Sequence, residues 1–281
     1  AALFPDRWSQ VLANAGGRLG FWGGAITWGK GEDQAWLLTP NFQELMKDYM
    51  AGGWNHRNDR LTRTAREGRF AFVQDFDVFT PDEWAELPIV REFLRPRGLG
   101  YGATTQVAPP GHPEMTVLFE HRLEAGIIRP DTMAALAGLR PHIARSLALA
   151  TRLQRQKADA MTFGLNAIGA PAAVLQANGL ILSANDLFLS LQKCFAAPTR
   201  DSIAIADERV NRLLYKALAG HDAGSFPLPA GEERPCILHV IPLRKKALDL
   251  SPKGNAIVLI SQPTGTIADA SALLKLSLIH I

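Results

Sequence analysis

Apolar residues recur along the first half of the chain in alternating helical and strand-like patterns. Apolar positions at three- and four-residue steps predict a helix behind Pro5-Asp6 that stops at Gly16-Gly17. Thr-Pro pairs at Thr39 and Thr80 predict two further helix starts. Strand-like stretches occupy residues 22–29, 33–39, 69–79, 98–108 and 115–123. The connections are too short for a doubly wound parallel sheet, so we expect an α+β fold with an antiparallel sheet.

Residues 130–168 form the longest run of helical periodicity in the sequence. Apolar side chains recur there at Met133, Leu136, Leu139, Ile143, Leu147, Leu153, Met161, Leu165 and Ile168. Pro141 interrupts the run, which predicts a break or a kink. Such a helix could pack on the first domain as a lid or pair with a second copy as a coiled coil, and the pattern leaves both open.

The remainder of the chain has the order of a small sensor module. Asn178-Gly179 predicts a hairpin between strands at Ala172–Gln176 and Leu180–Ser183. A short helix capped by Asn185 and a second at 207–220 follow, and strands at 235–245 and 255–262 close the module. Strand, strand, helix, helix, strand, strand is a PAS-like order.

The whole chain is therefore expected to hold two antiparallel-sheet sensor domains of GAF/PAS-like type joined by a long helix. The expected divisions are a sensor domain at 1–130, a connecting or dimerising helix at 131–168 and a PAS-like domain at 169–265. Residues 266–281 have the pattern of the start of a further helix.

Composition and charge narrow the class of protein without identifying a function. The 281 residues are 47% hydrophobic with a net charge of +3, which fits a globular protein and neither demands nor excludes nucleic acid. Cys194 and Cys236 lack metal-ligand spacing, and no apolar run could cross a bilayer, so we expect a reduced cytoplasmic protein without metal or cofactor.

No catalytic motif stands out, so we do not expect an enzyme. Nucleophile elbow, Walker-type and zinc-protease signatures are absent from the sequence. The glycines at 17, 20 and 23 lack the lysine of a phosphate cradle and indicate a turn. His112, Glu114, Glu120 and His121 share one hairpin, but alternation places Glu120 and His121 on opposite faces, which argues against a shared metal.

Three stretches resemble a known family. IVREFLRPRGLGYGATTQVAPP (89–110) and the longer stretch at 136–186, which begins LAGLRPHIARSL, are similar to segments of bacterial LuxR-type helix-turn-helix regulators. TIADASALLKL (266–276) resembles their approach to the DNA-binding domain. The resemblance implies the sensory part of a homodimeric transcriptional regulator that binds DNA only through a C-terminal domain. We expect that domain to be absent from this chain. Residues 276–281 match one translation of a transposase mosaic end, so we expect an artefactual tail there, with a genuine short tail as the alternative.

The resemblance also suggests where an effector and a second copy would bind. Quorum-sensing members of the wider group hold their ligands with a Tyr/Trp/Asp trio, which Tyr49, Trp54 and Asp59 could supply beside Trp84. Core aromatics and a helix-capping aspartate are the alternative. Dimerisation is expected through Leu136, Ile143, Leu147 and Leu153. The input region of a histidine kinase or diguanylate cyclase is the competing function.

Overall fold

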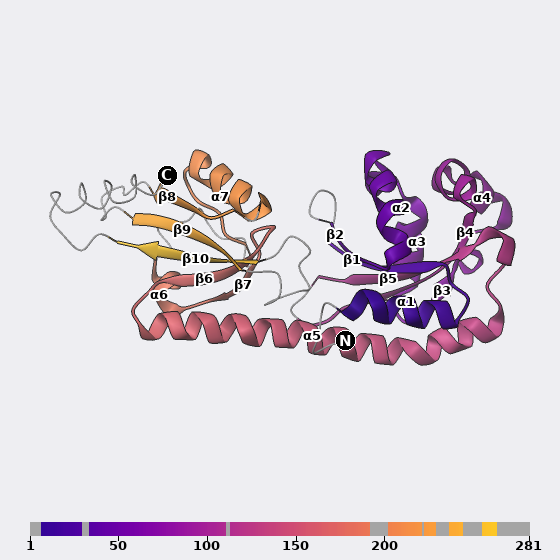
Figure 1. Cartoon of the computed structure of the whole chain (residues 1–281), viewed down its shortest axis with the longest axis horizontal. Helices are drawn as coiled ribbons and strands as arrows, with labels where there is room; N and C mark the ends of the chain where they lie inside the picture. The colour runs from indigo at the N-terminus through magenta and orange to yellow at the C-terminus, as the bar shows by residue number, and fades with distance from the viewer. Residues whose placement is uncertain are drawn as a thin grey trace. The chain divides into compact units, whose positions relative to one another are not determined.

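The computed structural model describes residues 7–29, 34–110, 113–191, 202–220, 222–228, 236–243 and 255–262. The chain divides into two units, Ala1–Leu153 and Gln154–Ile281, each built on its own sheet (Figure 1). Predictions for His112, Cys194 and residues 263–281 lie outside the described residues.

The first unit is an α+β unit with a five-stranded antiparallel sheet, as predicted. Its strands pair in the order β2-β1-β5-β4-β3. Their bounds are β1 Gly23–Trp28, β2 Ala35–Leu38, β3 Val73–Gln74, β4 Leu99–Val107 and β5 Met115–Arg122. Strand β5 is central, and its register with β4 sets Gly102 opposite Glu120.

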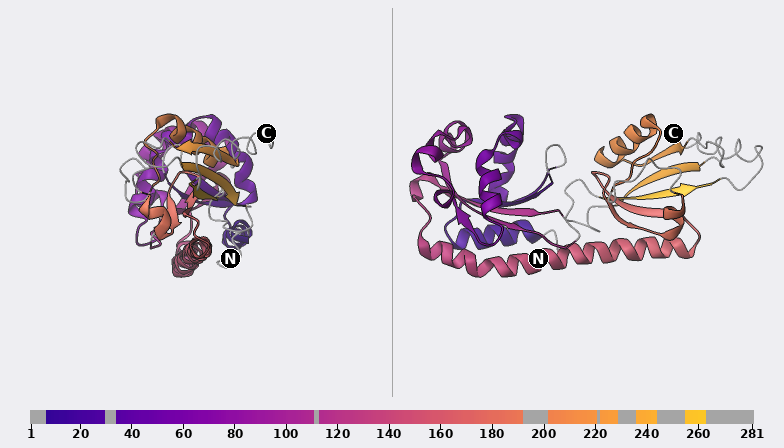
Figure 2. Two further views of the ribbon diagram at one scale, coloured as in Figure 1. Left: turned by 90° about the vertical axis from the view of Figure 1, so that its left-hand side faces the viewer. Right: turned by 180° about the vertical axis from the view of Figure 1, so that it is seen from behind.

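Helices cover both faces of the first sheet. Helices α2 (Pro40–Ala51) and α3 (Asp59–Glu67) lie on one face, and α1 (Trp8–Arg18) lies on the other (Figures 1 and 2). Side chains alternate between the two faces along a strand, so Glu120 of β5 points toward α2 and α3 while Phe119 points toward α1. Phe119 is buried beside Gly16 of α1.

Helix starts follow the predicted residues, with one difference in what a threonine does. Thr80 begins α4 (Pro81–Glu86) with a capping box: its hydroxyl accepts from Glu83 N–H at 3.2 Å, and Glu83 accepts from Thr80 N–H at 3.0 Å. Thr39 precedes α2, but its hydroxyl accepts from Gly24 N–H of β1 at 3.0 Å and does not cap the helix. Thr39 therefore ties the helix to the sheet.

The prediction of one strand over residues 69–79 is wrong. Pairing is confined to β3, and a short 3-10 helix, Asp75–Asp77, follows it. A π-helix, Ile89–Leu94, continues through the 3-10 turn Arg95–Arg97 to Gly98, whose φ of 67° ends it as predicted. Because the chain leaves the sheet after Gln74 and enters the 3-10 helix, the Asp75 side chain points into the protein interior and is buried.

Helix α5, Pro130–Ala167, is continuous through Pro141, so the predicted break does not occur. Within the first unit, Arg140 fixes α5 to β4. Its Nε donates to the Thr105 hydroxyl at 2.8 Å, and its Nη2 donates to the carbonyls of Arg69 at 2.5 Å and Gln106 at 3.0 Å. Proline removes a single helical hydrogen bond, and these three contacts hold the neighbouring turn in place.

The second unit repeats the strand order of the first. Its antiparallel sheet runs β7-β6-β10-β9-β8. The strands are β6 Ala172–Gln176, β7 Ile181–Ala184, β8 Gly224–Leu228, β9 Cys236–Leu243 and β10 Asn255–Ser261. The hairpin turn at Gly179, with φ of 80°, is confirmed, whereas β8 was missed.

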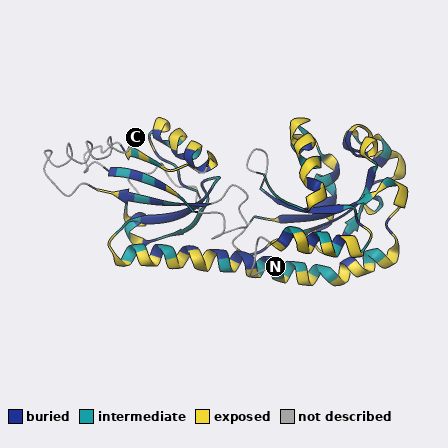
Figure 3. Ribbon diagram, in the orientation of Figure 1, coloured by how far each residue is buried: buried dark blue, intermediate teal, exposed yellow. Residues whose placement is uncertain are grey.

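The core of the second unit lies on one face of this sheet. Helix α7 (Glu208–Gly220) buries Leu214 and Leu218 against Leu238 and Val240 of β9. Asn185 caps the short helix α6 (Asp186–Ser190) by accepting from Phe188 N–H at 2.9 Å. Buried residues concentrate in the inner strands of both sheets, while the helices expose their outer sides (Figure 3). Among the described residues, no helix is both long and apolar enough to span a membrane.

Candidate ligand-binding cavity in the first unit

A cavity of about 50 Å³ lies between the first sheet and the helices on one of its faces. Its walls come from β2, α2, α3, the π-helix, β4 and β5. One side is apolar and largely aromatic, and the other carries polar and charged groups. One water needs roughly 10–15 Å³ by this measure, so the cavity has room for a few waters or a small organic group.

The aromatic side is a continuous wall of three rings. Trp36 meets Tyr49 edge-on with 5.8 Å between centroids, and Tyr49 meets Phe93 edge-on at 5.7 Å. The Trp36 indole nitrogen is buried without a hydrogen-bond partner among the described residues. Burial raises the pKa of the Tyr49 phenol, which stays protonated at neutral pH and can donate.

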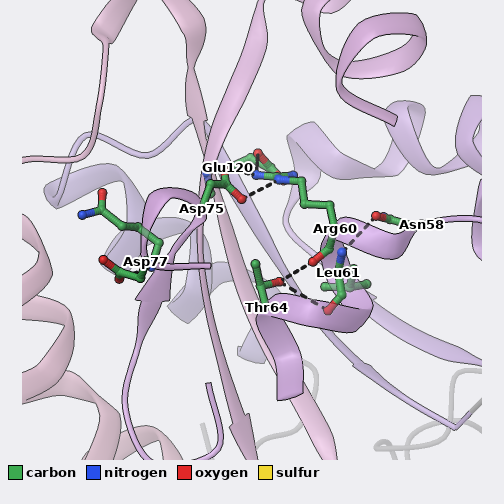
Figure 4. A network of polar contacts seen from close by, with 9 residues as sticks. Asn58, Arg60, Leu61, Thr64, Asp75, Asp77 and Glu120 are labelled. Atoms are coloured by element: carbon green, nitrogen blue, oxygen red, sulfur yellow. Dashed lines mark hydrogen bonds and ion pairs between the residues drawn. The ribbon is translucent and has the colours of Figure 1, made fainter. Parts of the chain in front are cut away.

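The polar side centres on the buried Arg60 guanidinium, which bridges two buried carboxylates (Figure 4). Arg60 Nε and Nη2 donate to the two oxygens of Asp75 at 2.7 and 2.9 Å. Nη1 and Nη2 donate to the two oxygens of Glu120 at 2.5 and 3.2 Å. Asp75 also accepts from Gly102 N–H at 2.8 Å, so this hydrogen bond holds the 3-10 helix Asp75–Asp77 against β4.

Local structure around Arg60 fixes its direction. Asn58 caps α3 by accepting from Leu61 N–H at 3.0 Å, and its amide nitrogen donates to the Tyr49 hydroxyl at 3.1 Å. Thr64, one turn on, donates to the Arg60 carbonyl at 2.8 Å. Asn58 thus connects the first turn of α3 to Tyr49 on the aromatic side, and Arg60 connects it to Glu120 on the polar side.

The charges of this cluster do not cancel. One guanidinium and two carboxylates leave a net charge of −1 when all three are ionised. Burial disfavours the charged guanidinium, but Asp75 and Glu120 outweigh it and raise the pKa of Arg60. Burial also raises the pKa of Glu120, and the opposing attraction of Arg60 is weaker. Glu120 is therefore the acid of the cluster that takes up a proton most readily, and protonation would leave the cluster neutral.

The predicted ligand residues are only partly brought together. Tyr49 lines the cavity, whereas Trp54 lies behind the wall with its ring 5.7 Å from that of Phe93. Asp59 is exposed on the first turn of α3, away from the cavity lining. Trp84 stacks on Tyr101 at 5.1 Å in the neighbouring aromatic core. The acid that lines the polar side is instead Glu120, and Asp75 holds Arg60 without lining the cavity.

Arg60, Asp75 and Glu120 were missed as a group because they lie on three separate elements. The only signal in the sequence is that Glu120 falls on the inward side of an otherwise apolar strand. An acid at such a position requires a partner.

The predicted dimer residues fall into two groups on α5. Leu136 and Leu147 are fully buried in the single chain, and Ile143 and Leu153 are half-buried. Exposed apolar side chains on the same helix are Leu149 and Phe163. In the part of the chain that the structure describes, no cluster of His, Cys, Asp and Glu could hold a metal.

Comparisons with known proteins give low-identity likenesses of fold. No family model matches the chain, and neither does any curated protein. The VqsR ligand-binding domain of Pseudomonas aeruginosa is 11% identical over 53% of this chain and 88% of that one, with a TM-score of 0.40. Escherichia coli SdiA is 17% identical over 54% of this chain and 62% of that one, with a TM-score of 0.39. The sensor region of a sensor histidine kinase is 15% identical over 90% and 91%, with a TM-score of 0.27. At these TM-scores the likenesses assign neither a family nor a function to the chain.

Proposed function

We propose that this chain is a sensory, non-enzymatic input region whose first unit binds a small molecule, within a bacterial transcriptional regulator of LuxR type. The observation that carries the sensory role is the cavity on the α2–α3 face of the first sheet. It combines an aromatic wall with a few convergent polar groups, the usual lining of a small-molecule site.

The transcriptional role rests on sequence. The stretches at 89–110 and 136–186 resemble segments of LuxR-type regulators. In the intact protein, DNA binding would belong to a helix-turn-helix domain following the second unit, and the regulator would act as a homodimer in the cytoplasm. Reading the gene downstream of codon 276 tests this: an encoded helix-turn-helix supports it, and a histidine-kinase or cyclase signature contradicts it.

Ligand binding can be tested by blocking the cavity from α2. Leu45 lines the cavity, whereas Met50 on the same helix is exposed and does not. We expect a compound from a chemically diverse panel to raise the melting temperature of the wild type and of Met50→Phe, but not of Leu45→Phe. A ligand at about 100 times its Kd stabilises the folded state by about 2.7 kcal/mol, a shift that calorimetry resolves.

Two results would contradict the ligand-binding role. One is a panel in which no compound of any charge class changes the melting temperature of the wild type. The other is an equal response in the Leu45→Phe and Met50→Phe proteins, which would place the binding site elsewhere.

A further inference from the structure

The charged side of the cavity favours ligands of one sign. Glu120 is only 5% exposed yet contributes to the cavity lining, together with Arg60. Among the described residues, Arg60 is the cation whose charge acts on Glu120, and the nearby Asp75 adds a second negative charge. With Glu120 ionised, a group entering the cavity meets one excess negative charge in surroundings of low dielectric constant, where charge interactions are strong. A ligand cation beside Glu120 would favour this ionised form over the protonated form that burial favours.

Arg60 does not offer an anion a place to bind. Four hydrogen bonds commit its guanidinium to the carboxylates of Asp75 and Glu120. A carboxylate or phosphate on a ligand would have to displace one of these acids and leave it buried without a partner. Removing the partner of a buried charge is strongly unfavourable, so the cluster excludes anionic ligands.

The opposite wall suits a cation as well as a hydrocarbon. The rings of Trp36, Tyr49 and Phe93 present apolar surface, and aromatic faces attract ammonium groups. The Tyr49 hydroxyl oxygen, which accepts from Asn58, can also accept from an ammonium N–H.

We infer that the cavity binds a small organic cation, an alkylammonium compound whose charged group faces Glu120 and whose carbon chain lies against the aromatic wall. This inference rests on the proposed ligand-binding function and names its ligand class. The cavity volume of about 50 Å³ limits the enclosed part to a few heavy atoms.

The test compares ligands that differ only in charge. Butylammonium, butanol and butanoate are titrated into the full 281-residue chain at pH 7, with binding measured by calorimetry. We expect butylammonium to bind at least tenfold more tightly than butanol and butanoate to bind least. This comparison needs only the wild-type protein, so it remains decisive if a variant fails to fold.

Two variants locate the charge responsible. Glu120→Gln removes the negative charge while keeping the shape, and we expect it to lose the tenfold preference for butylammonium over butanol. Glu124→Gln makes the same change at an exposed position outside the cavity and should keep the preference.

The outcomes separate this inference from the function on which it rests. Butanol or butanoate binding as tightly as butylammonium, with Leu45→Phe abolishing it, would overturn the cationic ligand class and leave small-molecule binding intact. Retention of the full preference in Glu120→Gln would overturn the role of Glu120. If neither these compounds nor any in the diverse panel bound, both the inference and the proposed ligand-binding function would fall.

Discussion

Gly102 and Arg60 depend on each other. The Arg60 guanidinium passes so close to the Gly102 backbone that a Cβ at position 102 would collide with Nη2. The same glycine donates its N–H to Asp75 at 2.8 Å. Close approach of a buried side chain to the backbone is one of the few reasons for glycine in the interior of a strand.

Substituting this glycine should disrupt the charged cluster. We expect Gly102→Ala to lower the free energy of unfolding by roughly 3 kcal/mol, because Arg60 must withdraw from at least one buried carboxylate. Urea denaturation measures the change. Gly138→Ala on α5 is the control: a Cβ there meets nothing within 4 Å, and helix propensity predicts a gain of about 0.5–1 kcal/mol. Equal effects of the two substitutions would contradict the steric argument.

At the residue scale, Tyr49 is the one predicted ligand residue that lines the cavity. Aromatic residues that are clustered in the sequence indicate a core or a pocket, and this signal predicts Tyr49 as a ligand residue. The Arg60 contacts join positions 15 and 60 residues apart in the sequence, which no local pattern connects. Asp59 and Asp75 are the same residue type, and only the turn that follows β3 decides which of them faces inward.

At the element scale, α3 and β8 escaped prediction for two different physical reasons. Helix α3 buries Arg60, Thr64 and Ala65, so its inward face carries almost no apolar signal. Strand β8 is five residues long and contains Pro227, which weakens a strand pattern. Elements with a clear apolar face, such as α2, α5, α7 and the central strands, were predicted. Periodicity reports hydrophobic burial, and it fails where the buried groups are polar.

The attachment of α5 to the first sheet should depend on one side chain. Arg140 makes hydrogen bonds to Thr105, Arg69 and Gln106. We expect Arg140→Ala to weaken this attachment by about 1.5–3 kcal/mol, the usual contribution of hydrogen bonds to a charged group. Hydrogen exchange should then accelerate in the α5 amides around position 140. Arg145→Ala, exposed on the same helix, should leave exchange unchanged within about 0.5 kcal/mol. Identical exchange in all three proteins would show that Arg140 does not hold the helix.

At the scale of the whole molecule, the chain builds one sheet order twice. Both sheets place their first and last strands at the centre, and each unit has apolar core clusters formed from its own residues. The sequence shows no repeat that would announce this. The strand order depends on the positions of turns and of alternating apolar residues. Different amino acids can provide the same turns and the same alternation.

Self-association through α5 is expected at this scale. Phe163 is 77% exposed on α5, so a second copy of the chain could cover its ring. We expect the wild type to sediment as a dimer at micromolar concentration and Phe163→Asp to shift it toward monomer by at least tenfold in Kd. Leu189→Asp, on the exposed side of α6, is the matched control and should leave the dimer intact. A wild type that remains monomeric at high concentration would exclude this interface.

The doubled strand order also poses a hazard while the chain folds. The middle strand of one sheet could pair by mistake with the strands of the other sheet, because both sheets are antiparallel and have the same strand order. Strand β5 would then carry Glu120 into a core whose β10 supplies Ala256, Val258 and Ile260. The Glu120 carboxylate, buried there without the Arg60 guanidinium, would strongly destabilise such a mispaired sheet, so the mispaired sheet would not persist. The charged cluster would therefore disfavour an exchange of β5 and β10 between the two sheets during folding.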